Sequence, residues 1–154
     1  MLTYRLATYA DADLFFHWAN ESSTRNNSYN HEQISYEDHI KWFNKRVNNP
    51  DVCMFIFYDK QETAIGQVRI EKELKKQECL IGISVSETQR GKGYSSEMIH
   101  KASLEFIFRN PGFSILAYVF LSNQASFKSF LKAGYQLVEE REINGIPSYI
   151  LKYN

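Results

Sequence analysis

The feature that most constrains this chain is a predicted strand, a glycine-bearing loop and a helix that follow one another between residues 80 and 108. Glycines at positions 91 and 93 allow the backbone to turn tightly and bring consecutive amides toward one point. The helix behind the loop adds the positive end of its dipole. The unit therefore predicts a cradle for an anion such as a pyrophosphate, with Arg90 and Lys92 placing cationic charge beside it.

The loop differs from the two familiar nucleotide-binding motifs. It lacks the Gly-x-x-x-x-Gly-Lys-Ser/Thr spacing of a P-loop, and it lacks the third glycine of the dinucleotide fingerprint Gly-x-Gly-x-x-Gly. Two glycines before a helix also occur as a plain tight turn. The spacing alone leaves both a pyrophosphate site and a structural turn open.

Hydrophobic patterns in the rest of the chain predict an α/β fold in a single domain over residues 1–154. The predicted strands cover residues 2–6, 52–58, 64–70, 79–85, 114–120, 135–141 and 148–153. The predicted helices are a short one capped by Asp11, one that begins at Ser35, one after the glycine loop and one over residues 123–133. The polar segment 20–32 is predicted to be a loop. This order indicates a mixed, mostly antiparallel sheet of about seven strands with four flanking helices.

Composition argues against several functions for such a domain. Lys plus Arg and Asp plus Glu both number 18, and a net charge of zero disfavours a general nucleic-acid binder. No apolar run approaches the roughly 20 residues that cross a bilayer, and the first ten residues do not resemble a signal peptide. Cys53 and Cys79 lie in apolar segments and are expected to be buried thiols rather than a disulfide or zinc ligands. We expect a cytoplasmic protein without a metal or a membrane partner.

Two motifs identify a family. The segment Arg90-Gly91-Lys92-Gly93-Tyr94-Ser95 resembles the Gln/Arg-x-x-Gly-x-Gly/Ala signature of the GCN5-related N-acetyltransferases, with Ser95 in place of the final Gly or Ala. The segment from Asn123 to Tyr135 resembles a later motif of the same family, in which a polar residue opens a helix that ends in Lys-x-Gly-aromatic. The resemblance covers the whole chain. It implies a sheet that splays at the cofactor site and acetyl-CoA as the co-substrate.

The resemblance also implies which residues hold the cofactor. The loop amides would bind the pyrophosphate, and the pantetheine arm would lie between the strand through Ile83 and Val85 and the strand 114–120. Asn123 matches a position that contacts this arm, although it is also a plain helix cap. The expected cofactor-binding residues are Ile83, Ser84, Val85, Arg90, Gly91, Lys92, Gly93, Tyr94, Ser95, Asn123, Ser126 and Phe130.

The catalytic groups are less well defined. The resemblance implies that a backbone N–H near Val85 stabilises the oxyanion. Many family members carry a tyrosine general acid where this chain has Phe130, so Ser126 and Tyr94 are the alternative proton donors, or the thiolate leaves unaided. The candidate bases are His39, Glu87 and Glu78, and each is equally compatible with a role outside the site.

The amino-terminal third is expected to select the acceptor, a small-molecule amine. Segments 16–20, 25–28 and 34–43 resemble acetyltransferases that act on nucleotide-linked amino sugars in bacterial surface-glycan synthesis. Aromatic rings in this region could stack on a sugar or a base, and Arg25 could pair with a phosphate, although such rings are often core residues. The expected acceptor-binding residues are Trp18, Arg25, Tyr29, Tyr36, His39 and Trp42.

Two other functions stay open. The broader pattern also resembles ribosomal-protein N-terminal acetyltransferases, which would make the acceptor a protein amino terminus. Alternatively, Phe130 marks a non-catalytic module that binds acetyl-CoA. The sequence also leaves a homodimer open.

Overall fold

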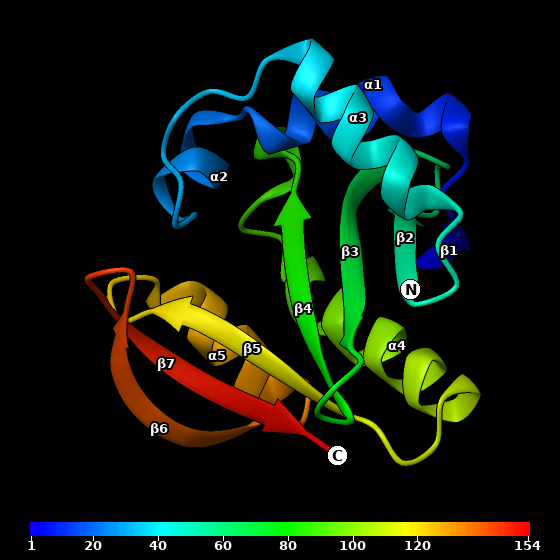
Figure 1. Cartoon of the computed structure of the whole chain (residues 1–154). Helices are drawn as coiled ribbons and strands as arrows, with labels where there is room; N and C mark the ends of the chain where they lie inside the picture. Colours follow the sequence, from blue (N-terminus) through cyan, green and yellow to red (C-terminus); the bar gives the residue numbers. More distant parts are fainter.

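A computed structural model describes residues 1–154, and its strands form one sheet (Figure 1). The strands are β1 (Thr3–Leu6), β2 (Val52–Tyr58), β3 (Ala64–Glu73), β4 (Glu78–Val85), β5 (Ser114–Phe120), β6 (Gln136–Ile143) and β7 (Ile146–Tyr153). The helices are α1 (Ala12–Ala19), α2 (Ser22–Asn26), α3 (Tyr36–Val47), α4 (Tyr94–Arg109) and α5 (Gln124–Lys132), with short 3-10 turns at Tyr9–Asp11 and Glu87–Gln89.

The sheet has the strand order β1-β2-β3-β4-β5-β7-β6. All neighbouring strands are antiparallel except β4 and β5, which are parallel. The predicted α/β fold with a mixed, mostly antiparallel sheet of seven strands is therefore confirmed.

The parallel pair β4–β5 is joined over only part of its length. Pairing runs from Glu78 opposite Ser114 to Leu80 opposite Leu116 and then stops, and the two strands diverge toward their carboxyl ends (Figure 1). The expected splay next to the glycine loop is thus present. The carboxyl-terminal half of β4 therefore has no neighbouring strand on the side of β5.

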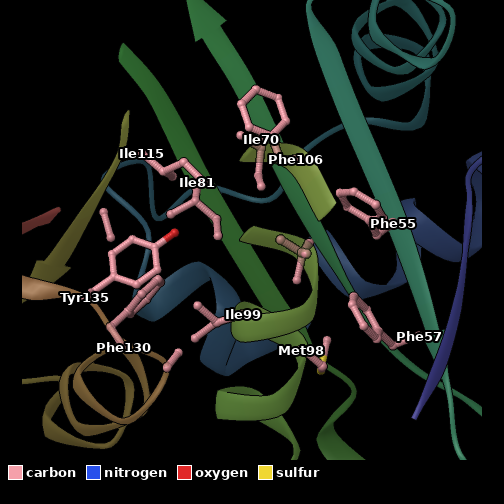
Figure 2. Packing of buried hydrophobic residues seen from close by; sticks show 14 of the residues in the cluster. Phe55, Phe57, Ile70, Ile81, Met98, Ile99, Phe106, Ile115, Phe130 and Tyr135 are labelled. Atoms are coloured by element: carbon pink, nitrogen blue, oxygen red, sulfur yellow. The ribbon is translucent and has the colours of Figure 1, made fainter. Parts of the chain in front are cut away.

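Side chains on the two faces of the sheet form two cores. On one face, Met98, Ile99 and Phe106 of α4 pack against residues such as Phe55 and Phe57 (Figure 2). On the other face, the side chains of α1 and α3 cover the neighbouring residues of β2. This second core contains Ala12, Phe15, Trp18, Phe43, Met54 and Ile56. Alternation along β2 therefore supplies both layers.

Local sequence signals explain some helix boundaries and miss others. Ser35 caps α3 as predicted, because its Oγ accepts a hydrogen bond from the Asp38 amide at 3.2 Å. Asp11 precedes α1 but makes no side-chain cap; its carboxylate instead accepts from the Arg5 guanidinium at 2.8 Å and from the Thr8 amide at 2.7 Å. The Asp11 carboxylate is thus engaged by this partly buried ion pair and does not cap α1.

The number of helices corrects a second expectation. Segment 20–32, predicted to be a loop, contains the short helix α2, so five α-helices flank the sheet rather than four. This helix has no buried residue and hence no apolar periodicity for a sequence pattern to detect. It is stabilised by Arg25, whose guanidinium donates hydrogen bonds to the carbonyls of Ala19 and Asn30.

Three further features bear on the composition. Both cysteines are free thiols, with Cys79 buried and Cys53 half-buried. None of the helices has the length and hydrophobicity that a membrane span requires. No group of three or more His, Cys, Asp or Glu side chains is placed to hold a metal ion.

Candidate active site

A cleft of about 470 Å³ opens where β4 and β5 separate. This volume falls within the range of known small-molecule sites, roughly 300–1,000 Å³. The cleft is lined by the segment after α1 and by α2, by β3 and β4, by the glycine loop and the start of α4, and by β5 and α5. The strand splay therefore places the loop singled out by the sequence beside a cavity.

The glycine loop presents a row of free backbone amides to this cleft. Gly91 and Gly93 have φ values of 76° and 79°, in the left-handed region that glycine adopts without strain. The amides of residues 91–96 donate no hydrogen bond within the protein, and Gly93 provides no side-chain cap for α4. Free amides at a helix N-terminus form an anion site, so this geometry fits a pyrophosphate.

The two basic residues of the loop are engaged by the protein itself. Arg90 lines the cleft, but its Nε donates to the Val85 carbonyl at 2.9 Å and its Nη2 donates to Thr24 Oγ1 at 3.2 Å. The same Nη2 lies 3.6 Å from the buried carboxylate of Glu21. Lys92 does not line the cleft itself, but its Nζ donates to Oε1 of the lining residue Gln89 at 3.0 Å. The contact between Lys92 and the pyrophosphate stays a prediction.

The free edge of β4 exposes backbone groups to the gap. The Ser86 amide donates to the Ile65 carbonyl on β3, and hydrogen-bonded pairs alternate along an antiparallel ladder. The backbone N–H and C=O of Ser84 therefore pair with β3. Those of Ile83 and Val85 point the other way, toward the gap between β4 and β5. The Val85 carbonyl is taken by Arg90, which leaves the Val85 amide and both backbone groups of Ile83 free.

Helix α5 forms the opposite wall. Asn123 caps the helix, since its Oδ1 accepts from the Ser126 amide at 3.3 Å, and both residues line the cleft. Phe130 also lines the cleft while packing at a centroid distance of 5.0 Å against Tyr135 in the core (Figure 2). The wall thus offers the Ser126 hydroxyl, and the ring at position 130 offers no proton.

The three candidate bases lie outside the cleft. His39 is 2% exposed, with Nε2 at 2.8 Å from the Ala12 carbonyl and its ring against Trp42, and burial lowers the pKa of His39. The side chain of Glu87 does not line the cleft, and the Glu87 amide is held by Glu21 Oε2. Glu78 stands at the paired end of β4, away from the splay. None of the three lines the cleft, because His39 is packed between α1 and α3, Glu87 begins a 3-10 turn and Glu78 begins β4. The identity of the base stays a prediction.

The expected acceptor walls are mostly structural. Trp18 is 2% exposed and packs against Phe15 in the second core, so its ring is closed to a ligand. Trp42 lies outside the cleft, and the guanidinium groups of Arg46 and Arg69 stand over its ring. The hydroxyl of Tyr36 donates to Asp13 on α1, also outside the cleft. None of these three rings lines the cleft, because they pack α1 and α3 against each other and against the sheet. Their role in acceptor binding stays a prediction.

Two other predicted acceptor residues lie at or beside the cleft. Arg25 lines it, although most of its guanidinium is used on backbone carbonyls of its own segment. Tyr29 does not line the cleft. Its hydroxyl shares a hydrogen bond of 2.6 Å with Ser148 on β7, and its ring packs edge-on against the lining residue Phe120. Tyr29 therefore supports a wall instead of forming it.

The lining residues that were not singled out from the sequence include four with polar side chains: Ser23, Gln67, Arg69 and Tyr118. Gln67 and Arg69 alternate with apolar residues on β3, and this alternation was the available signal that both point away from α4. Tyr118 occupies the same kind of position on β5. Polar residues in a strand are commonly solvent-facing, so only the observed splay shows that these border a cavity.

Comparison with known proteins agrees with the fold. A family model described as an acetyltransferase (GNAT) domain matches residues 1–136, and no curated protein sequence matches the chain. The spermidine N-acetyltransferase of Vibrio cholerae, solved with CoA and spermine, is 18% identical with a TM-score of 0.84, covering 99% of this chain and 94% of its own. An aminoglycoside acetyltransferase, AAC(6')-Ib, solved with coenzyme A and kanamycin, is also 18% identical, with a TM-score of 0.82 and the same coverage.

These structures share the fold, and the family assignment rests on the match over residues 1–136 together with the free amides of the glycine loop. The chain therefore belongs to the GCN5-related N-acetyltransferase (GNAT) family and is an acetyl-CoA-dependent N-acetyltransferase.

Proposed function

We propose that residues 1–154 act as one catalytic domain that acetylates the primary amine of a nucleotide-linked amino sugar. The observation that carries this acceptor is the charge of the cleft. Its charged lining side chains are Arg25, Arg69 and Arg90, and all three are cationic. A cationic wall attracts a phosphate-bearing acceptor and repels a polycation such as spermidine or kanamycin.

The chain's own backbone would hold the co-substrate, which supplies a thioester acyl group. The free amides of residues 91–96 would bind the pyrophosphate, and the free backbone groups of Ile83 would pair with the pantetheine arm; their lack of partners within the protein supports both roles. We propose the Val85 amide as the donor that stabilises charge on the carbonyl oxygen, because it faces the gap without a partner.

Any side chain that transfers a proton in the reaction has to come from the residues that line the cleft. Tyr94 and Ser126 remain the proposed donors to the leaving sulfur, and Tyr118 adds a third hydroxyl from β5. A thiol with a pKa of about 8.5 also leaves readily without a donor. Because the lining contains no carboxylate and no imidazole, we propose that the amine enters neutral and releases its proton to water after attack.

An acceptor panel tests this proposal. Release of free CoA thiol is followed with acetyl-CoA and, separately, nucleotide-linked 4-amino sugars, spermidine, kanamycin and a peptide with a free amino terminus. We expect the highest kcat/KM with a nucleotide-linked amino sugar. A higher value with spermidine or kanamycin would overturn the charge argument, and a higher value with the peptide would favour the protein N-terminal acetyltransferase.

A further inference from the structure

Several residues that line the cleft carry unpartnered buried polar atoms. Four buried side-chain atoms in the protein lack a hydrogen-bond partner, and three of them belong to lining residues: Ser23 Oγ, Gln67 Oε1 and Arg69 Nε. Folded proteins pair nearly all buried polar groups, so unpaired groups on residues that line a cavity point to contacts that a ligand completes.

Gln67 and Arg69 lie two residues apart on β3 and therefore on the same face. Their partners across the ladder, Ser84 and Gly82, share that face, which is opposite to α4. The Nε2 of Gln67 donates to Ser84 Oγ at 2.9 Å, and this bond leaves the carbonyl oxygen of Gln67 as a free acceptor.

The Arg69 guanidinium lies across Gly82, toward the point where the strands separate. A Cβ placed on Gly82 would stand 3.2 Å from Arg69 Nη2, so the missing side chain provides the space that the guanidinium occupies. Leu80 is the last residue of β4 that pairs with β5, and Gly82 lies two positions after it. The absence of a side chain at Gly82 therefore leaves room for the Arg69 guanidinium in the wall of the cleft, where β4 and β5 begin to separate.

Neighbouring groups orient Arg69 without neutralising it fully. Its Cζ stands 5.0 Å from the centroid of the Trp42 ring. The carboxylate of Glu71 accepts a hydrogen bond from Arg46 and is 3.6 Å from Arg69 Nε, outside hydrogen-bond distance. Burial lowers the pKa of Arg69, which reflects a charge that is desolvated and only partly compensated.

We propose that Gln67 and Arg69 form the acceptor-recognition subsite, in which the guanidinium binds a phosphate of the acceptor and the Gln67 amide oxygen accepts a hydrogen bond from a hydroxyl of the same molecule. This inference rests on the proposed function and names the residues that select its substrate. Arg69 is a specificity-determining residue here, and acetyl-CoA is bound elsewhere, at the glycine loop.

The test compares Arg69→Gln with Arg46→Gln. Both guanidinium groups stand over Trp42 and lie beside Glu71, but only Arg69 lines the cleft, so Arg46→Gln is the matched control. UDP is titrated by calorimetry into protein saturated with CoA, which blocks the glycine loop. Loss of a charge-assisted contact should weaken UDP binding in Arg69→Gln by about tenfold to 100-fold. Arg46→Gln frees the Glu71 carboxylate to pair with Arg69 and should weaken UDP binding less than Arg69→Gln does.

A second variant guards against a folding defect. Gln67→Glu keeps the side-chain volume and places a carboxylate on the same strand face as Arg69, so it should weaken UDP binding similarly while melting temperature and acetyl-CoA KM stay at the wild-type values. Equal UDP affinity in wild type and Arg69→Gln, equal weakening by Arg46→Gln, or no UDP binding by CoA-saturated wild type would each overturn the subsite. Arginine-dependent UDP binding without acetylation of any nucleotide-linked amino sugar would instead overturn the proposed function and keep the subsite.

Discussion

Replacing Gly93 with alanine should separate the cost of backbone strain from the loss of cofactor binding. Gly93 has φ = 79° and a Cβ at this position would meet no atom within 4 Å. Gly145, in the turn between β6 and β7, has the same φ of 79° and the same empty surroundings, but it lies outside the cleft. Gly145→Ala is therefore a control that differs only in location.

The structure sets the magnitude of both effects. A left-handed conformation costs a non-glycine residue about 1–2 kcal/mol, so both variants should lose that much free energy of unfolding in urea. Only Gly93→Ala adds a methyl group at the N-terminus of α4, where the free amides face the cleft. Loss of one charge-assisted hydrogen bond, about 1.5–3 kcal/mol, should raise the Kd for acetyl-CoA by about tenfold to 100-fold.

The assay is isothermal calorimetry of acetyl-CoA with both variants, alongside urea unfolding. The reasoning is refuted if Gly93→Ala loses the same stability as Gly145→Ala and its Kd for acetyl-CoA stays within about twofold of wild type, a difference under 0.5 kcal/mol. A loss of affinity in Gly145→Ala of the same size would refute it as well, because the effect would then arise from the fold and not from the loop.

Three other substitutions test separate parts of the structure. His39→Gln should leave the pH profile of kcat/KM unchanged, because the ring lies outside the cleft. Burial lowers the pKa of His39, so stability that is present above about pH 6.5 should fall on acidification in wild type and fall less in the variant, as pH-dependent melting will show. Tyr135→Phe removes a buried hydroxyl that is 2.8 Å from Ser103 Oγ and should lower the free energy of unfolding by about 1–2 kcal/mol in urea titrations. Gly82→Ala should displace the tip of Arg69 and raise the acceptor KM while the acetyl-CoA KM is kept; an unchanged acceptor KM would count against the subsite.

The conformation of the glycine loop was predictable because its signal is local. Gly91 and Gly93 sit in a loop whose conformation depends on residues within a few positions, and the strand and helix around them have strong periodicity. Asn123 was predictable for the same reason, since a cap is set by the residues of its own helix.

The acceptor half depends on contacts between distant segments, which one sequence does not reveal. Trp18 and His39 looked equally suitable for a pocket and for a core, and the packing of α1 against α3 places both in the core. A polar residue in a strand, such as Arg69, is usually exposed to solvent. Arg69 instead lines the cleft, because β4 and β5 separate beyond Leu80. The short helix α2 escaped prediction because it buries no residue.

The hydrogen bonds of Arg90 and Lys92 also bear on how acetyl-CoA binding depends on salt concentration. Arg90 is hydrogen-bonded to Val85 and Thr24, and Lys92 is hydrogen-bonded to Gln89, so the proposed pyrophosphate site consists mainly of neutral amide dipoles. Fixed dipoles at contact distance are screened by mobile ions far less than separated surface charges. The contribution of these amides to acetyl-CoA affinity should therefore change little with ionic strength, and the salt dependence that remains should come from the arginines that line the cleft.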